Sequence, residues 1–195
     1  MRKCALLLSF VVLALGAWFL AVARAGPAAP GAANADVEKV ADAVNNPAQL
    51  RKLAAGLVTN FELRDVSWAF KPREKGGLGV GPQPGAIDPD AIQLKLIQMG
   101  GQKGISAADL KANKADYQRV AEITRAIAEA MPGYVTKYTA NAGTAKQWVG
   151  FADDMKKGSD DLIAALKTNN LQAIKQAAGK LNQSCNGCHT AFRDN

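Results

Sequence analysis

Two cysteines and the single histidine of the chain lie close together near the C-terminal end, in the segment Cys185-Asn186-Gly187-Cys188-His189. A C-x-x-C-H segment is the covalent attachment signature of c-type haem. The two thiols reach the two vinyl groups of one porphyrin, and the adjacent imidazole takes an axial position on the iron. Residues three and four apart share one face of a helix, so one helical segment can place all three groups. The segment therefore predicts one covalently bound haem c, with His189 as an iron ligand.

The same cysteines could instead form a structural disulfide, a thiol redox pair or half of a zinc site. A zinc site requires four ligands, and the sequence offers neither a second cysteine pair nor a second histidine to complete one. Thioredoxin-like pairs lie near a βαβ pattern, whereas no strand pattern precedes Cys185. The haem hypothesis is therefore favoured over these three alternatives.

Residues 1–25 have the pattern of a secretory signal. Arg2 and Lys3 supply a charged region, residues 5–22 are almost wholly apolar, and Ala23-Arg24-Ala25 offers small residues at a cleavage site. We expect cleavage after Ala25 and a periplasmic mature protein. The apolar run is about 18 residues long, at the lower limit of membrane-spanning length, so an uncleaved N-terminal membrane anchor is the alternative.

The remaining chain, 26–195, is long enough for one domain with a core and too short to favour two. The full sequence has 24 basic and 17 acidic residues, and its formal net charge is +7. The basic residues are interspersed with acidic ones and form no aromatic and basic platform, which argues against nucleic acid as a partner. A mildly basic surface suits an acidic redox partner, although an ordinary mixed-charge exterior explains the same composition.

The C-terminal half of the sequence predicts three helices, over residues 106–131, 144–167 and 170–193. Each has apolar residues at alternating steps of three and four, which is typical of a helix packed on one side. In the last helix, Cys185 and Cys188 continue the apolar stripe, so we expect the haem on its core side. The short connection Thr168-Asn169-Asn170 favours antiparallel packing of the last two helices.

The N-terminal half is helical in pattern but less regular. Apolar residues follow helical spacing over 36–70, with a break at Asn46-Pro47. Residues 71–89 contain repeated glycine and proline, which excludes regular structure and predicts a long loop. A short helix over 90–99 follows. No β-type alternation appears, so we expect an all-α four-helix bundle with a Gly/Pro-rich loop and a short extra helix between the first and second main helices.

The end of the chain resembles cytochrome c′ and the wider class II cytochromes c, whose attachment segment lies on the last helix of a four-helix bundle. The resemblance rests on Cys185-Asn186-Gly187-Cys188-His189-Thr190-Ala191-Phe192-Arg193 and extends over about 112–193. It implies thioether bonds at both cysteines, proximal ligation by His189, and a haem that lies near Phe192 and Arg193. It also implies a homodimer through the first two helices. Phe192 could instead be ordinary core, and Arg193 a solvated helix end.

The sixth iron position could hold methionine, lysine or water, or stay empty, because a second histidine is excluded within one chain. The low-spin class II members take a methionine from their first helix, whereas the region 36–70 contains none. Of Met99, Met131 and Met155, Met99 is the best candidate, because it ends a short helix beside the irregular segment. We expect instead a five-coordinate iron whose distal face is closed by apolar side chains of the first-helix region, such as Leu50, Leu53, Leu57 and Phe61.

These features predict a periplasmic mono-haem cytochrome that transfers one electron. Its expected partners are a periplasmic redox protein and the haem-maturation machinery that attaches the cofactor. The alternative is a sensor or scavenger that binds nitric oxide or carbon monoxide at an open ferrous iron. An enzyme such as a peroxidase is not expected, because the chain offers no distal histidine as acid or base.

Overall fold

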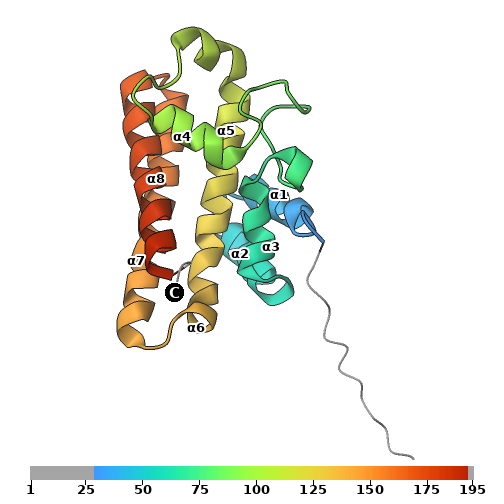
Figure 1. Cartoon of the computed structure of the whole chain (residues 1–195), viewed down its shortest axis with the longest axis vertical. Coiled ribbons are helices and arrows are strands. Elements are labelled where there is room, and N and C mark those ends of the chain that lie inside the picture. Colours follow the sequence, from blue (N-terminus) through green and yellow to red (C-terminus); the bar gives the residue numbers. More distant parts are fainter. Residues whose placement is uncertain (1–28, 193–195) are drawn as a thin grey trace, which may run out of the picture.

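Residues 29–192 of the chain form an all-α fold, as the computed structural model describes it (Figure 1). This range contains helices and turns but no strand, which confirms the predicted fold class. Within the same range, no helix is both long and apolar enough to cross a membrane. The predicted signal segment 1–25 and Arg193 lie outside the described residues.

The bundle consists of α4 (Ile92–Gly100), α5 (Ala107–Ala130), α7 (Ala142–Lys167) and α8 (Leu171–Phe192). α7 packs against both α5 and α8, and α4 packs across the first half of α8. α7 runs antiparallel to α5 and to α8 (Figure 1). The tight turn between α7 and α8 depends on two asparagines. Asn169 takes a positive φ of 55°, and the side chain of Asn170 accepts a hydrogen bond from the Ala173 amide at 3.0 Å.

Capping boxes start α5 and α7. The Ser106 hydroxyl accepts a hydrogen bond from the Asp109 amide at 3.0 Å, and the Asp109 carboxylate accepts one from the Ser106 amide at 3.2 Å. Asn141 and Thr144 form the equivalent pair before α7. Each box satisfies two backbone donors that the first helical turn leaves without partners. The first box starts α5 at Ala107, next to the expected position 106, and the second starts α7 at Ala142, two residues before the expected position 144.

The region 36–70 is divided into α1 (Asn34–Asp42), α2 (Pro47–Asn60), α3 (Leu63–Ser67) and the 3-10 turn η1 (Trp68–Phe70). Pro47 occupies the first turn of α2, and the Asn46 side chain accepts a hydrogen bond from the Gln49 amide at 3.2 Å. A new helix therefore starts at this point of the chain. α1 and α2 pack against α5, on the side away from α7 and α8 (Figure 1). The bundle thus has an additional helical layer over α5.

The Gly/Pro-rich segment 71–89 is ordered around the side chain of Arg73. The guanidinium donates to the Asp90 carboxylate at 2.9 Å and to a backbone carbonyl of the loop. The same carboxylate accepts a hydrogen bond from the Val80 amide at 2.7 Å. Arg73–Lys75 forms a 3-10 turn, η2, so the expectation that no regular structure occurs in this segment is wrong at that turn. One ion pair and its hydrogen bonds replace the secondary structure that glycine and proline prevent elsewhere in the loop.

Lys95 fixes α4 to the end of this loop. Its side chain is 1% exposed, and its ammonium donates to the Asp88 carbonyl at 2.6 Å and to the Gln98 side-chain oxygen at 2.7 Å. The same ammonium lies 5.5 Å from the ring centre of Tyr117 in α5. Burial lowers the pKa of Lys95, while the carboxylates of Asp88 and Asp109 act in the opposite direction. The loop, α4 and α5 therefore meet at one buried cation.

Candidate functional site

The candidate site lies at the C-terminal end of α8. Cys188 is buried and Cys185 is partly buried, and both belong to the hydrophobic core or pack against it. The two thiols are not joined in a disulfide. The side chain of His189, one residue further along the helix, is exposed. The last turns of α8 therefore present two thiols toward the core and an imidazole beside them at the surface.

Burial keeps both thiols in the protonated state. It raises the pKa of Cys185 to about 11, with a smaller contribution from the neighbouring Cys188, and it also raises the pKa of Cys188. At neutral pH the site thus offers two neutral thiols and one imidazole. A thiol that adds across a vinyl group forms a thioether with no change in charge. This set of groups therefore fits a covalently attached haem with a nitrogen ligand to its iron.

Close packing on α7 holds this end of α8 in place. The Ser184 hydroxyl donates to the Phe151 carbonyl at 2.9 Å. Gly187, which lies between the two cysteines, faces the same residue, because a β-carbon at Gly187 would lie 2.6 Å from the Phe151 ring. Glycine at this position allows the helical turn of residues 185–188, the proposed attachment turn, to approach α7 closely.

An aromatic cluster continues from the end of α8. The ring centre of Phe192 lies 5.1 Å from that of Trp148 and 6.4 Å from that of Phe151, edge to face in both cases. Tyr138 stacks on the other side of the cluster, with its ring centre 5.4 Å from that of Trp148 and an interplanar angle of 4°. Phe192 therefore packs toward α7 in this structure. No sequence pattern associated Trp148, Phe151 or Tyr138 with the site.

Met131, at the start of the 3-10 turn η3 (Met131–Tyr134), lies at the same end of the bundle as this cluster. Its backbone carbonyl accepts a hydrogen bond from the indole nitrogen of Trp148 at 2.8 Å, and its side chain is 8% exposed. The end of α5, the start of α7 and the end of α8 therefore meet around Trp148.

Met99 lies in a different part of the bundle. It is fully buried at the end of α4, and the next residue, Gly100, lies against Gly179 of α8. Gly179 precedes His189 by ten residues of helix, which corresponds to about 15 Å at a rise of 1.5 Å per residue. This separation weighs against Met99 as a ligand to the iron that His189 would bind.

The apolar residues expected over the distal face are also far from α8. Leu50 and Leu57 are buried, and Leu53 and Phe61 pack against the core, but α2 contacts α5, α1 and η3. The Tyr134 hydroxyl ties the end of α2 to η3, since it donates toward the carbonyls of Leu57 at 3.2 Å and Phe61 at 3.0 Å. α2 and α8 lie on opposite sides of α5 (Figure 1). The expectation that α2 closes the distal face is therefore not supported by its position.

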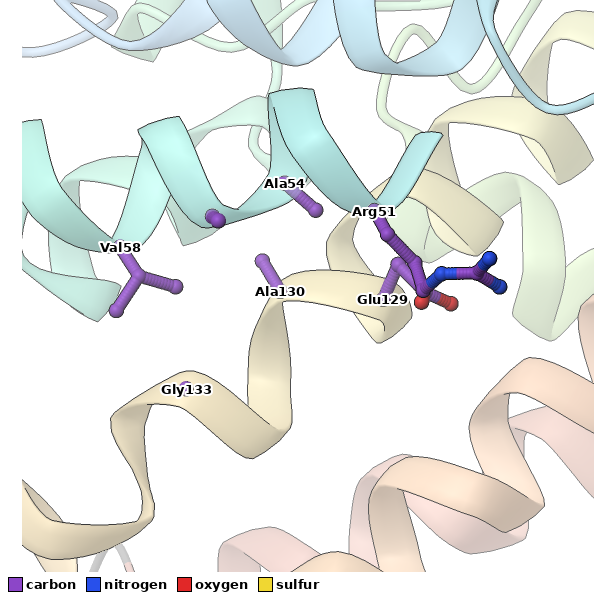
Figure 2. A pocket seen from close by; sticks show the side chains of 7 residues that line it. Arg51, Ala54, Val58, Glu129, Ala130 and Gly133 are labelled. Carbon is purple, nitrogen blue, oxygen red and sulfur yellow. The ribbon is translucent and has the colours of Figure 1, made fainter. Parts of the chain in front are cut away.

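Two surface grooves lie near these helices. One, of about 210 Å³, separates α2 from the end of α5, and Figure 2 shows Ala54, Ala130 and Gly133 in it, with Arg51 and Glu129 at one end. The other, of about 380 Å³, lies between α7 and α8 and includes Ser184. Cys185, Cys188 and His189 line neither groove. These three residues thus lie at a packed helix end.

An all-α bundle whose last helix ends in a C-x-x-C-H segment defines the class of c-type cytochromes with C-terminal haem attachment. The family model of cytochrome c′ matches residues 93–193, which is more than half of the chain. The protein therefore belongs to the cytochrome c′ family. No curated protein and no solved structure matches the chain. The matched range covers α4, α5, α7 and α8, whereas α1, α2, α3 and the loop around Arg73 precede it.

Membership of this family indicates a haem-binding c-type cytochrome. Proteins of the family are typically periplasmic, and they typically carry electrons or bind small gases. The first helix of the matched range is α4, whereas the region 36–70, which contains no methionine, precedes that range.

Proposed function

We propose that the protein is an exported mono-haem cytochrome that accepts and passes on one electron. The observation that carries the proposal is the end of α8, where two neutral thiols and an exposed imidazole lie within two helical turns of one another. The chain that carries them belongs to the cytochrome c′ family. When bound, the haem supplies a reversible one-electron iron couple. Cys185 and Cys188 would hold it covalently, and His189 would ligate and orient it.

The protein contributes position and environment to this reaction. Ser184 and Gly187 hold the attachment turn against α7, so the thiols and the imidazole keep a fixed relation to the core. Cys188 is buried and Cys185 is partly buried, which supports a haem whose attached edge would face apolar side chains, one of the factors that set a haem potential. Electron transfer requires no other catalytic group from the chain.

A second candidate function, binding of nitric oxide or carbon monoxide, is favoured by the position of Met99. Because Met99 lies next to the contact of Gly100 with Gly179, and Gly179 is about 15 Å along α8 from His189, we propose that the iron has no protein ligand on its distal side. A five-coordinate ferrous iron would bind a small gas there, and the protein would act as a sensor or scavenger. Titration of the reduced protein with carbon monoxide separates the two functions, since an unchanged absorption spectrum would exclude gas binding.

Export and partners complete the proposal. Cleavage after Ala25 delivers the chain to the periplasm, where haem-maturation machinery attaches the cofactor and a redox protein exchanges the electron. An uncleaved anchor would leave the same domain at the membrane surface. A homodimer through the first two helices of the matched range would use the outer face of α4, where Leu94 and Ile97 are 46% and 42% exposed, because α1 and α2 cover α5.

The direct test is expression of the full chain together with a haem-maturation system. We expect haem stain that stays with the protein in a denaturing gel and is lost in the double variant Cys185→Ala, Cys188→Ala. His189→Ala is the matched control, because it keeps both thiols, retains the covalent stain and changes only the iron spectrum. Stain that persists in the double variant, or that is absent from the unmodified protein, would contradict the proposal.

A further inference from the structure

Tyr138 is unusual among the aromatic side chains of residues 29–192, because it is both exposed and in contact with the core. Three large apolar side chains in this range are exposed, namely Leu94, Ile97 and Tyr138. Leu94 and Ile97 lie on α4, far from the end of α8. Tyr138 is 38% exposed at the end of the short helix α6 (Val135–Tyr138), next to the start of α7.

A continuous series of ring contacts leads inward from Tyr138. Its ring stacks on Trp148 at 5.4 Å between ring centres, and Trp148 meets Phe192 edge to face at 5.1 Å. Trp148 is 2% exposed, so the middle of the series is shielded from water. Phe192 follows His189 by three residues on α8, and side chains at this spacing are neighbours on a helix. The series thus joins the protein surface to the side chain beside the proposed iron ligand.

The geometry of this series is fixed by contacts outside it. The Trp148 indole donates to the Met131 carbonyl at 2.8 Å, which sets the orientation of the ring. Phe192 is held from a second side by Phe151. Buried or hydrogen-bonded aromatic rings with few rotatable bonds keep their mutual orientation. Electronic coupling through touching rings therefore does not depend on transient encounters between mobile side chains.

The charges around Tyr138 are balanced. Burial raises the pKa of its hydroxyl most, the carboxylate of Glu62 raises it further, and the nearby Lys137 acts in the opposite direction. Lys137 and Glu62 form an ion pair at 3.1 Å. Arg64 and Asp65, which follow Glu62 closely in sequence, form another ion pair at 3.1 Å. A partner at this position would therefore be held by contact with the exposed ring rather than by net charge, as in small and transient redox encounters.

We propose that Tyr138, Trp148 and Phe192 form an electron relay, through which a redox protein in contact with Tyr138 exchanges one electron with the haem. This inference rests on the proposed function, since it requires the haem at His189. In the reductive direction, the partner loses one electron and Fe(III) becomes Fe(II). The three rings act as a bridge and are not themselves oxidised, so no bond forms or breaks and no proton moves.

The test uses the full holoprotein with a photoactive ruthenium(II) polypyridyl complex attached to a single introduced cysteine. Ala140→Cys places the complex two residues from Tyr138 on an exposed position, and Ile97→Cys places it on α4 as the matched control. A flash excites the complex, which gives one electron to Fe(III), and the absorbance of the reduced haem reports the rate. The covalent haem occupies Cys185 and Cys188, so neither competes for the label in the exported chain.

We expect Tyr138→Leu to slow the electron transfer from position 140 several-fold, because it removes the first ring. Tyr138→Phe should keep the rate, because the bridge needs the ring and not the hydroxyl. Neither variant should change the rate from position 97. Equal rates in Tyr138→Leu and the unmodified protein, or equal slowing from both labelled positions, would overturn the relay. Failure of the proposed function is distinguishable, because it would appear as absent covalent haem before any flash is applied.

Discussion

The backbone of Gly100, at the end of α4, lies directly against that of Gly179 in α8. A β-carbon at Gly100 would lie 2.7 Å from the Gly179 nitrogen and 2.8 Å from its α-carbon. Real β-carbons essentially never approach backbone this closely, so the helix crossing requires glycine at position 100. The contact is asymmetric, because a β-carbon at Gly179 would meet its nearest neighbour, the Gly100 oxygen, at 3.8 Å.

Gly100→Ala should therefore destabilise the protein, whereas Gly179→Ala should not. Overpacking at position 100 is expected to cost about 1–3 kcal/mol of unfolding free energy. At position 179, in the interior of α8, alanine fits and is expected to add about 0.5–1 kcal/mol, since glycine is less favourable in a helix. Urea unfolding of the two variants measures the difference, and equal effects would show that α4 does not cross α8 at this contact.

Met99→Leu should leave the iron spectrum unchanged. The geometry places Met99 in the core beside the crossing of α4 and α8, and a swap of similar volume there is expected to cost less than about 1.5 kcal/mol. The absorption spectra of the oxidised and reduced holoprotein give the readout. A change from low-spin to high-spin bands in this variant would identify Met99 as the sixth ligand and would require α4 to move along α8.

Trp148→Phe should destabilise the end of the bundle that carries the attachment turn. It removes the hydrogen bond from the indole to the Met131 carbonyl and part of a side chain that is 2% exposed. The loss of one such hydrogen bond costs about 0.5–1.5 kcal/mol, and the lost packing adds to this cost. Tyr138→Phe is the matched control, because it removes a hydroxyl from an exposed residue of the same cluster and is expected to change the stability by less than about 0.5 kcal/mol. Chemical denaturation should show a larger loss of unfolding free energy for Trp148→Phe than for Tyr138→Phe.

The stability of the protein should depend on Lys95 at alkaline pH. Burial lowers the pKa of Lys95 in the folded state below its ordinary value of 10.5. Between these two values the unfolded chain holds a proton that the folded chain has released, so this group makes the protein more stable as the pH rises. Lys95→Met lacks the group. The unfolding free energy of the unmodified protein, relative to that of the variant, is therefore expected to increase from neutral pH to about pH 10.5.

Comparison with the variant is necessary because tyrosines titrate in the same range. Burial raises the pKa of Tyr117 and of Tyr134, and a raised tyrosine pKa makes the folded protein less stable above the ordinary value of 10.0. The comparison is made with Tyr117→Phe in both proteins, because Tyr117 contacts Lys95, and the contribution of Tyr134 then cancels in the difference. A relative stability that stays constant or falls as the pH rises would mean that Lys95 is not buried as a cation.

The helix that carries the site could be predicted from sequence because its signal is local. The apolar spacing of α8 and the asparagines before it specify the helix, its start and the face on which Cys185 and Cys188 lie. The position of α2 could not be predicted in this way. Its spacing shows that one face is buried, but the same spacing fits a helix on either side of α5. Only the packing of the whole chain decides on which side of α5 the helix α2 lies.

The aromatic cluster escaped prediction for a related reason. Tyr138, Trp148 and Phe192 lie on three different helices, and they meet because α7 reverses the chain between them. No periodic pattern joins residues so far apart. The order in segment 71–89 was missed because it depends on one side chain, Arg73, whose partner Asp90 lies at the other end of the loop.

The additional layer of α1 and α2 also restricts the substitutions that α5 can accept. Arg119 of α5 reaches Asp42 of α1 at 2.7 Å, and Arg125 reaches Asp160 of α7 at 2.9 Å, so α5 is bound on two sides. Its buried residues are correspondingly numerous and mostly small toward its end: Leu110, Tyr117, Val120, Ala121, Ile123, Thr124, Ala126, Ile127, Ala128 and Ala130. A substitution at most of these positions must suit two interfaces at once. We therefore expect α5 to accept the fewest changes over evolutionary time and the outer helices to diverge around it.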